Sequence, residues 1–529
     1  MTHKKIVIIG GGIGGLSAAF DLLNSGFQVE IYERNAVCGG QARSISTPRC
    51  SSVYAWRIWT STYYNFFDIC SQIPTGHNAT VRDNFIELPL SYYKHDHTQV
   101  KFKTLDIRHF TSKWEYWRVL LKMVVMVCMS DARLKSLNMT FYDYIDPQEQ
   151  ATINFTDEFA GSLLGLEARK ATLRNVARGW NATYYSMGLW NGFQKPTIYV
   201  PNKPYSDAIF SPWVEYLQKK GVKIHTNNPI DDIEYNGTKV VSVTTASGIR
   251  VVADDFVLAL DQMALPKIIK GPLACIPEIS KACEIHKHGN NIWFGFMLYF
   301  SEEFSTDMFA ATGWDQPWKP ILQNYRNVWT SEAKQKCDSV ELLQVSVMNF
   351  VQGHNGKILE ECSVEEAVEE TLLQLRQSHL MRDFRTVSGK SVWEAYDGYE
   401  VWPYWKTGSD GKMYNTLDEY KLSINQGVWE RMPTTKTSVP NLFFGSVITQ
   451  TDTPMVSMEI ACTAGRNAAQ AIATKYYMPS PTVYSHPTFL PVILAPLRAL
   501  DTAIVQAPYL MLVVGFLLLI LFVYKRTSF

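Results

Sequence analysis

The chain has 529 residues, of which 46% are hydrophobic and 19% are charged. This composition supplies a large apolar core and excludes a disordered, collagen-like or disulfide-scaffold protein. The 50 basic residues equal the 50 acidic ones, so a net charge of zero provides no positive field and predicts no nucleic-acid partner. The nine cysteines include no CxxC pair, so we expect mostly reduced core cysteines and no metal site.

The first 32 residues predict a strand, a glycine-rich turn, a helix and a second strand. Lys5–Ile9 and Gln28–Tyr32 are apolar runs of strand length, and residues 16–24 between them have helical character. The turn contains the pattern G-x-G-x-x-G, which permits a tight bend, close approach of a pyrophosphate and close packing of the helix. The glycines of the pattern are Gly10, Gly12 and Gly15, and Gly14 in the same turn is a further candidate for cofactor binding.

An acidic residue follows the second strand. Glu33 lies 23 residues after Gly10, where a carboxylate can accept hydrogen bonds from both ribose hydroxyls of a dinucleotide. The same carboxylate repels a 2′-phosphate, so NADP is disfavoured. The next stretch suits a second loop that closes over a longer dinucleotide, and its candidate contact residues are Arg34, Gly39, Gly40 and Arg43.

Residues 33–44 resemble the amino-terminal signature of the flavin-dependent amine oxidase and phytoene desaturase superfamily. Two later segments are similar to the same superfamily and keep its order. Residues 210–260 match the return to the dinucleotide domain, which implies a main-chain contact between Ile230 and the adenine. Residues 441–446 resemble the strand that approaches the flavin, and residues 457–466 resemble the helix whose amino terminus points at the isoalloxazine ring.

The resemblance implies non-covalent FAD as the cofactor, because the covalent-flavin cysteine motif of the monoamine oxidases is not evident. It adds Gly445, Ser446 and Met458 to the cofactor-binding residues. Relatives commonly have Gly-Asp where this chain has Gly445 and Ser446, so serine replaces an acid that contacts the ribityl or pyrophosphate region. No catalytic side chain is predicted, since the flavin itself accepts the hydride.

The helix predicted over residues 457–466 is called the capping helix below. Aromatic residues upstream of it lie where relatives place the walls of the substrate pocket. The resemblance therefore implies that Trp402 and Trp405 line the substrate site, and packing in the core is the alternative. His286 and His288 form a close histidine pair, for which a loop cluster without a ligand is favoured over a metal site.

The matched segments predict an α/β protein with a Rossmann-like FAD-binding domain and an interleaved α+β substrate domain. The FAD-binding domain is discontinuous and comprises residues 1–50, 196–270 and 435–478. The substrate domain comprises residues 51–195 and 271–434. Residues 479–506 are predicted as a linker.

The carboxyl terminus predicts a transmembrane helix. Residues 507–524 contain no charged side chain, and 18 helical residues reach about 27 Å, close to the ~30 Å hydrocarbon core of a bilayer. A buried core helix is the alternative, weakened by the terminal position. No signal-peptide core precedes the first strand, so we expect a single-pass tail anchor with a cytosolic body, although Lys525 and Arg526 favour the opposite orientation.

The leading hypothesis is an FAD-dependent oxidoreductase that transfers hydride from a C–H bond of an apolar, isoprenoid- or carotenoid-like substrate to flavin N5. Oxygen or a quinone would take the electrons. The tail favours a lipid-soluble substrate, and so does the apolar stretch 119–129 if it lies at a membrane surface rather than in the core. An amine oxidase that produces peroxide is the first alternative. A non-catalytic flavoprotein or membrane scaffold is the second, and Ser446 is its best support.

Overall fold

The computed structural model describes residues 4–89, 91–93, 99–101, 112–161, 165–186, 197–306, 309–312, 316–348, 351–382, 384–452, 456–485 and 495–506. The chain forms two compact units. The first comprises Met1–Lys103 and Ser186–His486, and the second comprises Thr104–Tyr185 and Pro487–Phe529.

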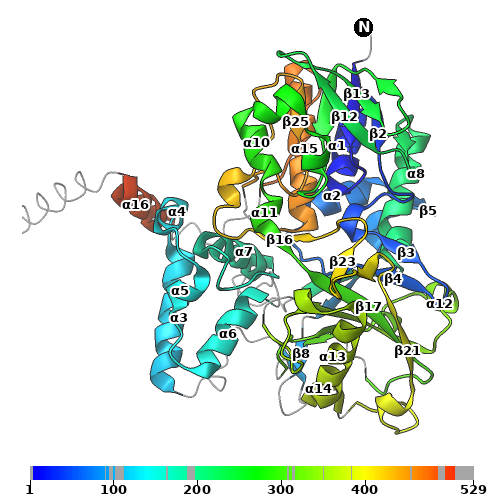
Figure 1. Ribbon diagram of the computed structural model, residues 1–529, viewed down its shortest axis with the longest axis vertical. Helices are drawn as coiled ribbons and strands as arrows, with labels where there is room; N and C mark the ends of the chain where they lie inside the picture. The colour runs from blue at the N-terminus through cyan, green and yellow to red at the C-terminus, as the bar shows by residue number, and fades with distance from the viewer. Residues whose placement is uncertain are drawn as a thin grey trace, which may run out of the picture. The chain divides into compact units, whose positions relative to one another are not determined.

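A five-stranded parallel sheet organises the first unit (Figure 1). Its order is β11–β2–β1–β15–β25, and every neighbouring pair is parallel. The central strand β1 is an apolar run, as expected of a strand covered on both faces. This topology is that of a doubly wound dinucleotide fold, so the predicted α/β, Rossmann-like architecture is confirmed. The strands are β1 (Lys5–Ile9), β2 (Gln28–Tyr32), β11 (Lys223–His225), β15 (Asp255–Leu258) and β25 (Leu442–Phe444).

Helices α1 (Ile13–Asn24) and α15 (Met458–Lys475) lie side by side next to this sheet (Figure 1). Helix α1 begins three residues before the predicted start, so Gly15 lies inside the helix rather than in the turn. A Cβ on Gly15 would lie 2.0 Å from the carbonyl oxygen of Gly10. Close packing of the helix against the strand therefore requires glycine and overrides its low helix propensity.

A small antiparallel sheet follows β11. It consists of β12 (Ile230–Tyr235), β13 (Val240–Thr245) and β14 (Arg250–Val251). The sequence pairs Asn236-Gly237 and Ser247-Gly248, which are typical of turns, lie in the connections between these strands, and Gly237 and Gly248 have the positive φ angles of +92° and +83° that such turns demand.

A second five-stranded sheet forms the rest of the core of this unit. Strands β17 (Trp293–Phe300) and β20 (Glu341–Met348) are buried along their whole length, and α13 (Val364–Gln377) packs against them. Strands β18 (Ala310–Thr312), β19 (Ile321–Gln323) and β21 (Tyr396–Val401) complete the sheet, whose order is β18–β19–β20–β17–β21.

Shorter elements connect these layers. The strands are β3 (Ser44–Ser46), β4 (Ser51–Val53), β5 (Pro74–Gly76), β6 (Ala79–Thr80), β7 (Phe85–Pro89), β8 (Ser91–Tyr93), β9 (Gln99–Lys101), β10 (Thr197–Pro201), β16 (Asn290–Asn291), β22 (Trp405–Thr407), β23 (Met413–Asn415) and β24 (Lys421–Leu422). The helices are α2 (Tyr64–Gln72), α8 (Ser211–Lys219), α9 (Leu265–Ile268), α10 (Pro277–Cys283), α11 (His286–Gly289), α12 (Ser331–Gln335) and α14 (His379–Arg382).

The second unit is helical over its described residues. It contains α3 (Lys113–Cys128), α4 (Asp131–Leu137), α5 (Phe141–Ile145), α6 (Gln150–Gly161), α7 (Leu173–Ser186) and α16 (Ala495–Gln506). The predicted first part of the substrate domain, residues 51–195, thus contributes to both units. Helix α16 lies within residues 479–506, where the sequence predicts only a linker.

Two further predictions concern cysteines and the membrane. Cys50 and Cys337 form a disulfide, whereas the other seven cysteines, all in the described ranges, are free. Four of the free cysteines are buried, as expected of core residues, whereas Cys275 is exposed and two are half-buried, so the prediction of mostly reduced core cysteines holds only in part. Within the described part of the chain no helix is both long and apolar enough to span a bilayer. The predicted transmembrane segment 507–524 lies outside the described residues.

Candidate functional site

The amino terminus of α1 is open to an anion. Gly12 is its N-cap, no side chain of the described residues caps the helix, and the first turn contains no acidic residue. The free amides and the positive end of the helix dipole therefore attract a phosphate. An added Cβ on Gly12 would meet only the Cα of Gly40, at 3.9 Å, so the second loop passes close to the uncapped end of the helix.

The second glycine loop is fixed against the first. The amide of Gly39 donates a 2.9 Å hydrogen bond to the carbonyl of Gly11. Gly39 and Gly40 have φ angles of +116° and +56°, which side-chain-bearing residues rarely adopt. The backbone of both loops thus lines one cradle, as the sequence predicts.

Glu33 is buried at the end of β2 and lies beside this cradle. One carboxylate oxygen accepts from the amide of Gly11 at 2.7 Å, and the other accepts from the amide of Asn35 at 2.8 Å. The first of these, Oε2, keeps a further lone pair for a ribose hydroxyl, whereas Oε1 also accepts from Nδ2 of Asn35 at 2.8 Å. The amide of Asn228 donates to the carbonyl of Glu33 at 2.9 Å, which brings the segment leading to Ile230 next to the acid.

The two predicted arginines differ in their surroundings. Arg34 is half-buried, with Nη2 3.9 Å from a carboxylate oxygen of Asp261. Arg43 is fully buried, donates to the carbonyl of Gly40 at 2.7 Å and pairs with Glu419 at 2.5 Å. Burial raises the pKa of Glu419, and the charge of Arg43 opposes this rise. Arg43 therefore stabilises the second glycine loop through its hydrogen bond to the carbonyl of Gly40.

The strand that reaches the capping helix ends at a buried serine. The amide of Ser446 donates to Oγ1 of Thr449 at 3.1 Å, whereas its own hydroxyl is shielded and has no partner in the described part of the protein. A buried hydroxyl without a partner fits a bound ligand. Met458 is the first residue of α15, where Ser457 caps the helix by accepting from the amide of Ile460 at 3.2 Å.

The glycine turn and the capping helix meet, as the resemblance implies. A Cβ on Gly14 would lie 2.2 Å from the carbonyl oxygen of Gly445, and one on Gly465 of α15 would lie 2.0 Å from the carbonyl oxygen of Gly14. The structure therefore brings residues that the sequence predicts to bind the cofactor, from distant segments, to one place.

The predicted substrate-lining tryptophans lie in a buried aromatic cluster. Trp402 meets Tyr54 edge-on at 6.3 Å, and Trp405 stacks on Tyr54 at 6.2 Å. The guanidinium of Arg43 lies 5.5 Å from the ring of Trp402, so the cluster adjoins the second glycine loop. Their role as walls of a substrate pocket stays a prediction.

A family profile described as flavin containing amine oxidoreductase matches residues 13–473. The chain belongs to this family. It is an FAD-dependent oxidoreductase, and the residues described above fit FAD. The uncapped end of α1 suits the pyrophosphate, and the unpartnered hydroxyl of Ser446 suits a polar group of the same ligand.

Two curated relatives and one solved structure illustrate the range of this family. Hydroxysqualene dehydroxylase of Zymomonas mobilis is 25% identical over 271 residues, which cover 46% of this chain and 58% of that protein. Zeta-carotene desaturase of Arabidopsis thaliana is 30% identical over 81 residues, 15% of this chain and 14% of that protein. The matches thus span less than two thirds of either relative. A putrescine oxidase variant has a TM-score of 0.64 at 14% identity, over 89% of this chain and 99% of that chain, which shows a shared fold.

Two cations near the flavin site are absent from the predicted set. Lys421 is buried with its Nζ 4.0 Å from the centroid of the Trp293 ring, and burial, reinforced by Arg57, lowers the pKa of Lys421 to about 7. Arg57 donates from Nη2 to the carbonyl of Gln41 in the second glycine loop. Its Nε is shielded and unbonded, and it forms no ion pair with a described carboxylate. Arg57 lies within an aromatic stretch that includes Trp59. A charged residue in such a stretch is the sequence signal that could have identified Arg57.

Helix α15 is also tied to its neighbours by charge. Arg466 pairs with Asp21 of α1 at 3.0 Å and with Asp68 of α2 at 2.7 Å. Burial raises the pKa of Asp21 to about 6 against the opposing charge of Arg466. Three helices around the flavin site therefore share one guanidinium.

Glu459 caps the amino terminus of α2 from the first turn of α15. Its carboxylate accepts from the amides of Asn65 and Phe66, each at 2.9 Å. Burial nevertheless raises the pKa of Glu459 from 4.5 to about 7, because desolvation outweighs these hydrogen bonds.

The raised pKa of Glu459 makes stability depend on pH. A carboxyl whose folded pKa exceeds its unfolded pKa stabilises the protein at pH below 4.5, and this contribution is lost as pH rises through about 7. We expect the unfolding free energy of the wild type to fall relative to that of Glu459→Gln by up to about 3 kcal/mol over this range. Urea unfolding of both proteins at several pH values measures the difference. The titration of Asp21 affects both proteins equally and therefore does not contribute to this difference. Parallel pH profiles would contradict the prediction.

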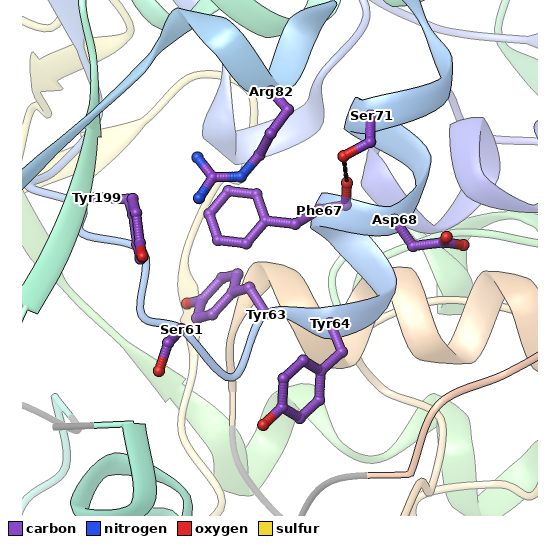
Figure 2. A pocket seen from close by; sticks show the side chains of 8 residues that line it. All are labelled: Ser61, Tyr63, Tyr64, Phe67, Asp68, Ser71, Arg82 and Tyr199. Carbon is purple, nitrogen blue, oxygen red and sulfur yellow. Dashed lines mark hydrogen bonds between the residues drawn. The ribbon is translucent and has the colours of Figure 1, made fainter. Parts of the chain in front are cut away.

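A cavity of about 290 Å³ opens elsewhere in the first unit, beside α2 (Figure 2). The guanidinium of Arg82 lies 4.0 Å from the ring centroid of Phe67 and 4.4 Å from that of Tyr199. None of the predicted site residues contributes to its wall, which is formed by Ser61, Tyr63, Tyr64, Phe67, Asp68, Ser71, Arg82 and Tyr199. Among the described residues, no group of three or more potential ligands could hold a metal ion.

Proposed function

We propose that this oxidoreductase oxidises an apolar, isoprenoid-like substrate by removing hydride from a C–H bond. The names of the two curated relatives refer to hydroxysqualene and to zeta-carotene, which supports a substrate of this class. When bound, the flavin supplies the hydride acceptor. The chain itself supplies an aromatic, water-excluding surface next to the second glycine loop, formed by Tyr54, Trp56, Trp293, Trp402 and Trp405.

The positive charge of this region is the observation that favours a neutral substrate over a protonated amine. Arg57 places a cationic side chain beside the aromatic surface, and no described carboxylate forms an ion pair with it; Lys421, with its pKa lowered to about 7, adds a partial positive charge near neutral pH. A protonated amine brought to the same place would meet like charges where screening by water is weak. A neutral, apolar substrate meets no such repulsion.

An amine oxidase is the second candidate. The similarity of fold to putrescine oxidase favours it, and Glu419 is a buried acid near the site. Its Oε1 is engaged by Arg43 at 2.5 Å, whereas its Oε2 is shielded without a partner in the described part of the chain, so one oxygen of this acid is left for an ammonium group.

The two candidates are separated by anaerobic mixing of the purified full chain with squalene-type hydrocarbons or with aliphatic amines. We expect isoprenoids to bleach the visible absorption of the flavin and putrescine to leave it unchanged. Bleaching by amines alone, with release of peroxide on admission of air, would overturn the proposal. Mass analysis of co-purifying small molecules gives an independent test of the substrate class. Oxygen or a quinone is proposed as the acceptor, and each is tested by the rate at which it restores the absorption.

We further propose that residues 507–524 anchor the protein in a membrane, with the body on the cytosolic side. A chain that ends at Gln506 is expected to lose its carbonate-resistant association with membranes. A chain that ends at Tyr524 keeps the apolar run and is the matched control. Carbonate-resistant pelleting of the shorter chain would show that the anchor lies elsewhere, and protection of the body from protease in sealed vesicles would reverse the orientation.

A further inference from the structure

Helix α3 is apolar on two opposite faces. Val119, Met123 and Met126 are buried on one face. The other face carries a second row of apolar side chains at helical spacing, of which Trp114 is 76% exposed and Leu121 is 64% exposed. A helix on a water-facing surface has polar residues at such positions, so this face is suited to an apolar environment. The row, called the α3 row below, consists of Trp114, Trp117, Leu121, Val124 and Val125.

Helix α16 of the same unit repeats the pattern. Leu497, Leu500 and Ile504 are exposed with the spacing i, i+3 and i+7. Asp501 on the same helix accepts a 2.9 Å hydrogen bond from the amide of Ser130, which follows directly on the C-cap residue of α3. The two exposed rows therefore belong to helices that are joined at the carboxyl end of α3.

The course of the chain indicates what covers these rows. Helix α16 ends at Gln506, five residues and about 7.5 Å of helix beyond Asp501. The uncharged run 507–524 begins at the next residue. A bilayer that contains this run therefore faces the end of the unit at which α3 and α16 are joined.

We propose that the α3 row lies in the interfacial layer of that bilayer, with α3 parallel to its surface. Indole rings favour the boundary between headgroups and acyl chains, and Trp114 and Trp117 provide two of them on one face. A stable protein partner would need about 20 residues a side, whereas an interfacial helix needs only its own apolar face. The proposal rests on the membrane attachment proposed above and is independent of the substrate.

The test uses tryptophan fluorescence of the full chain in phosphatidylcholine vesicles. The variant Trp114→Phe/Trp117→Phe keeps the row apolar and removes two indoles, and the run 507–524 contains no tryptophan. We expect dibrominated phosphatidylcholine to quench at least half of the emission by which the wild type exceeds this variant. The matched control is Trp393→Phe, whose indole nitrogen is buried in the first unit, and its emission difference should not be quenched.

Each other outcome overturns the proposal in a recognisable way. Protein that floats with the vesicles but shows no selective quenching is anchored by its tail alone, without contact between α3 and lipid. Protein that does not float lacks the membrane attachment itself. A second variant, Trp117→Glu/Leu121→Glu, should unfold within about 2 °C of the wild type in detergent, because exposed side chains contribute little to stability. A fall of more than 5 °C would show that the row packs against protein instead.

Discussion

Replacing Gly14 with alanine is expected to abolish the folded, flavin-binding protein. The added Cβ would lie 2.2 Å from the carbonyl oxygen of Gly445 and 3.2 Å from that of Ala461. Both neighbours are backbone atoms of the flavin-approaching strand and the capping helix, so no side chain can move aside. We expect a loss of at least about 3 kcal/mol in unfolding free energy, measured as soluble yield and by urea unfolding. A variant with wild-type stability would show that α1 and α15 are not packed this closely.

Gly12→Ala is the matched control, since it places the same methyl group in the same turn. Gly12 has φ −73°, which alanine adopts freely, and its Cβ would meet only the Cα of Gly40 at 3.9 Å. The apoprotein should keep its stability within about 1 kcal/mol. The methyl group lies at the uncapped amino terminus of α1, to which the pyrophosphate is assigned, so the affinity for FAD should fall at least tenfold. Unchanged FAD binding, measured by titration of the apoprotein, would show that the pyrophosphate lies elsewhere.

Local signals in the sequence predict the parallel sheet and its turn well. The strands Lys5–Ile9 and Gln28–Tyr32 have the predicted bounds because short apolar runs and flanking glycines are encoded within a few residues. The start of α1 is predicted three residues late because Gly15 reads as a turn residue. Glycine is required at this position because α1 packs closely against the end of strand β1, which is a tertiary contact.

The charged residues around the site could not be predicted in the same way. Glu419 lies 376 positions from its partner Arg43, and no motif marks either Glu419 or Lys421 as buried. The capping of α2 by Glu459 likewise joins residues nearly 400 positions apart. Such pairs follow from the packing of complete elements, so they become visible only once the fold is known.

The buried pair of Arg43 and Glu419 gives the second large effect. Their side chains are 1% and 2% exposed, and Nη1 lies 2.5 Å from Oε1. Arg43→Met leaves the carboxylate of Glu419 buried without its partner, and we expect a loss of about 3–5 kcal/mol in unfolding free energy. Because Arg43 also donates to the carbonyl of Gly40 at 2.7 Å, the second glycine loop should loosen and the variant should release FAD more readily. Thermal unfolding and the flavin content of purified protein measure the two effects.

Burial, rather than charge alone, is the expected cause, and two controls separate them. The pair Arg250 and Glu234 has a similar separation of 2.7 Å, but its side chains are 52% and 53% exposed, so Arg250→Met should cost at most about 1 kcal/mol. The double variant Arg43→Met/Glu419→Leu removes both buried charges and should recover most of the stability lost by Arg43→Met. Its FAD should still be retained less well, because the bond to the carbonyl of Gly40 is not restored. Equal losses at the buried and the exposed pair would contradict this account.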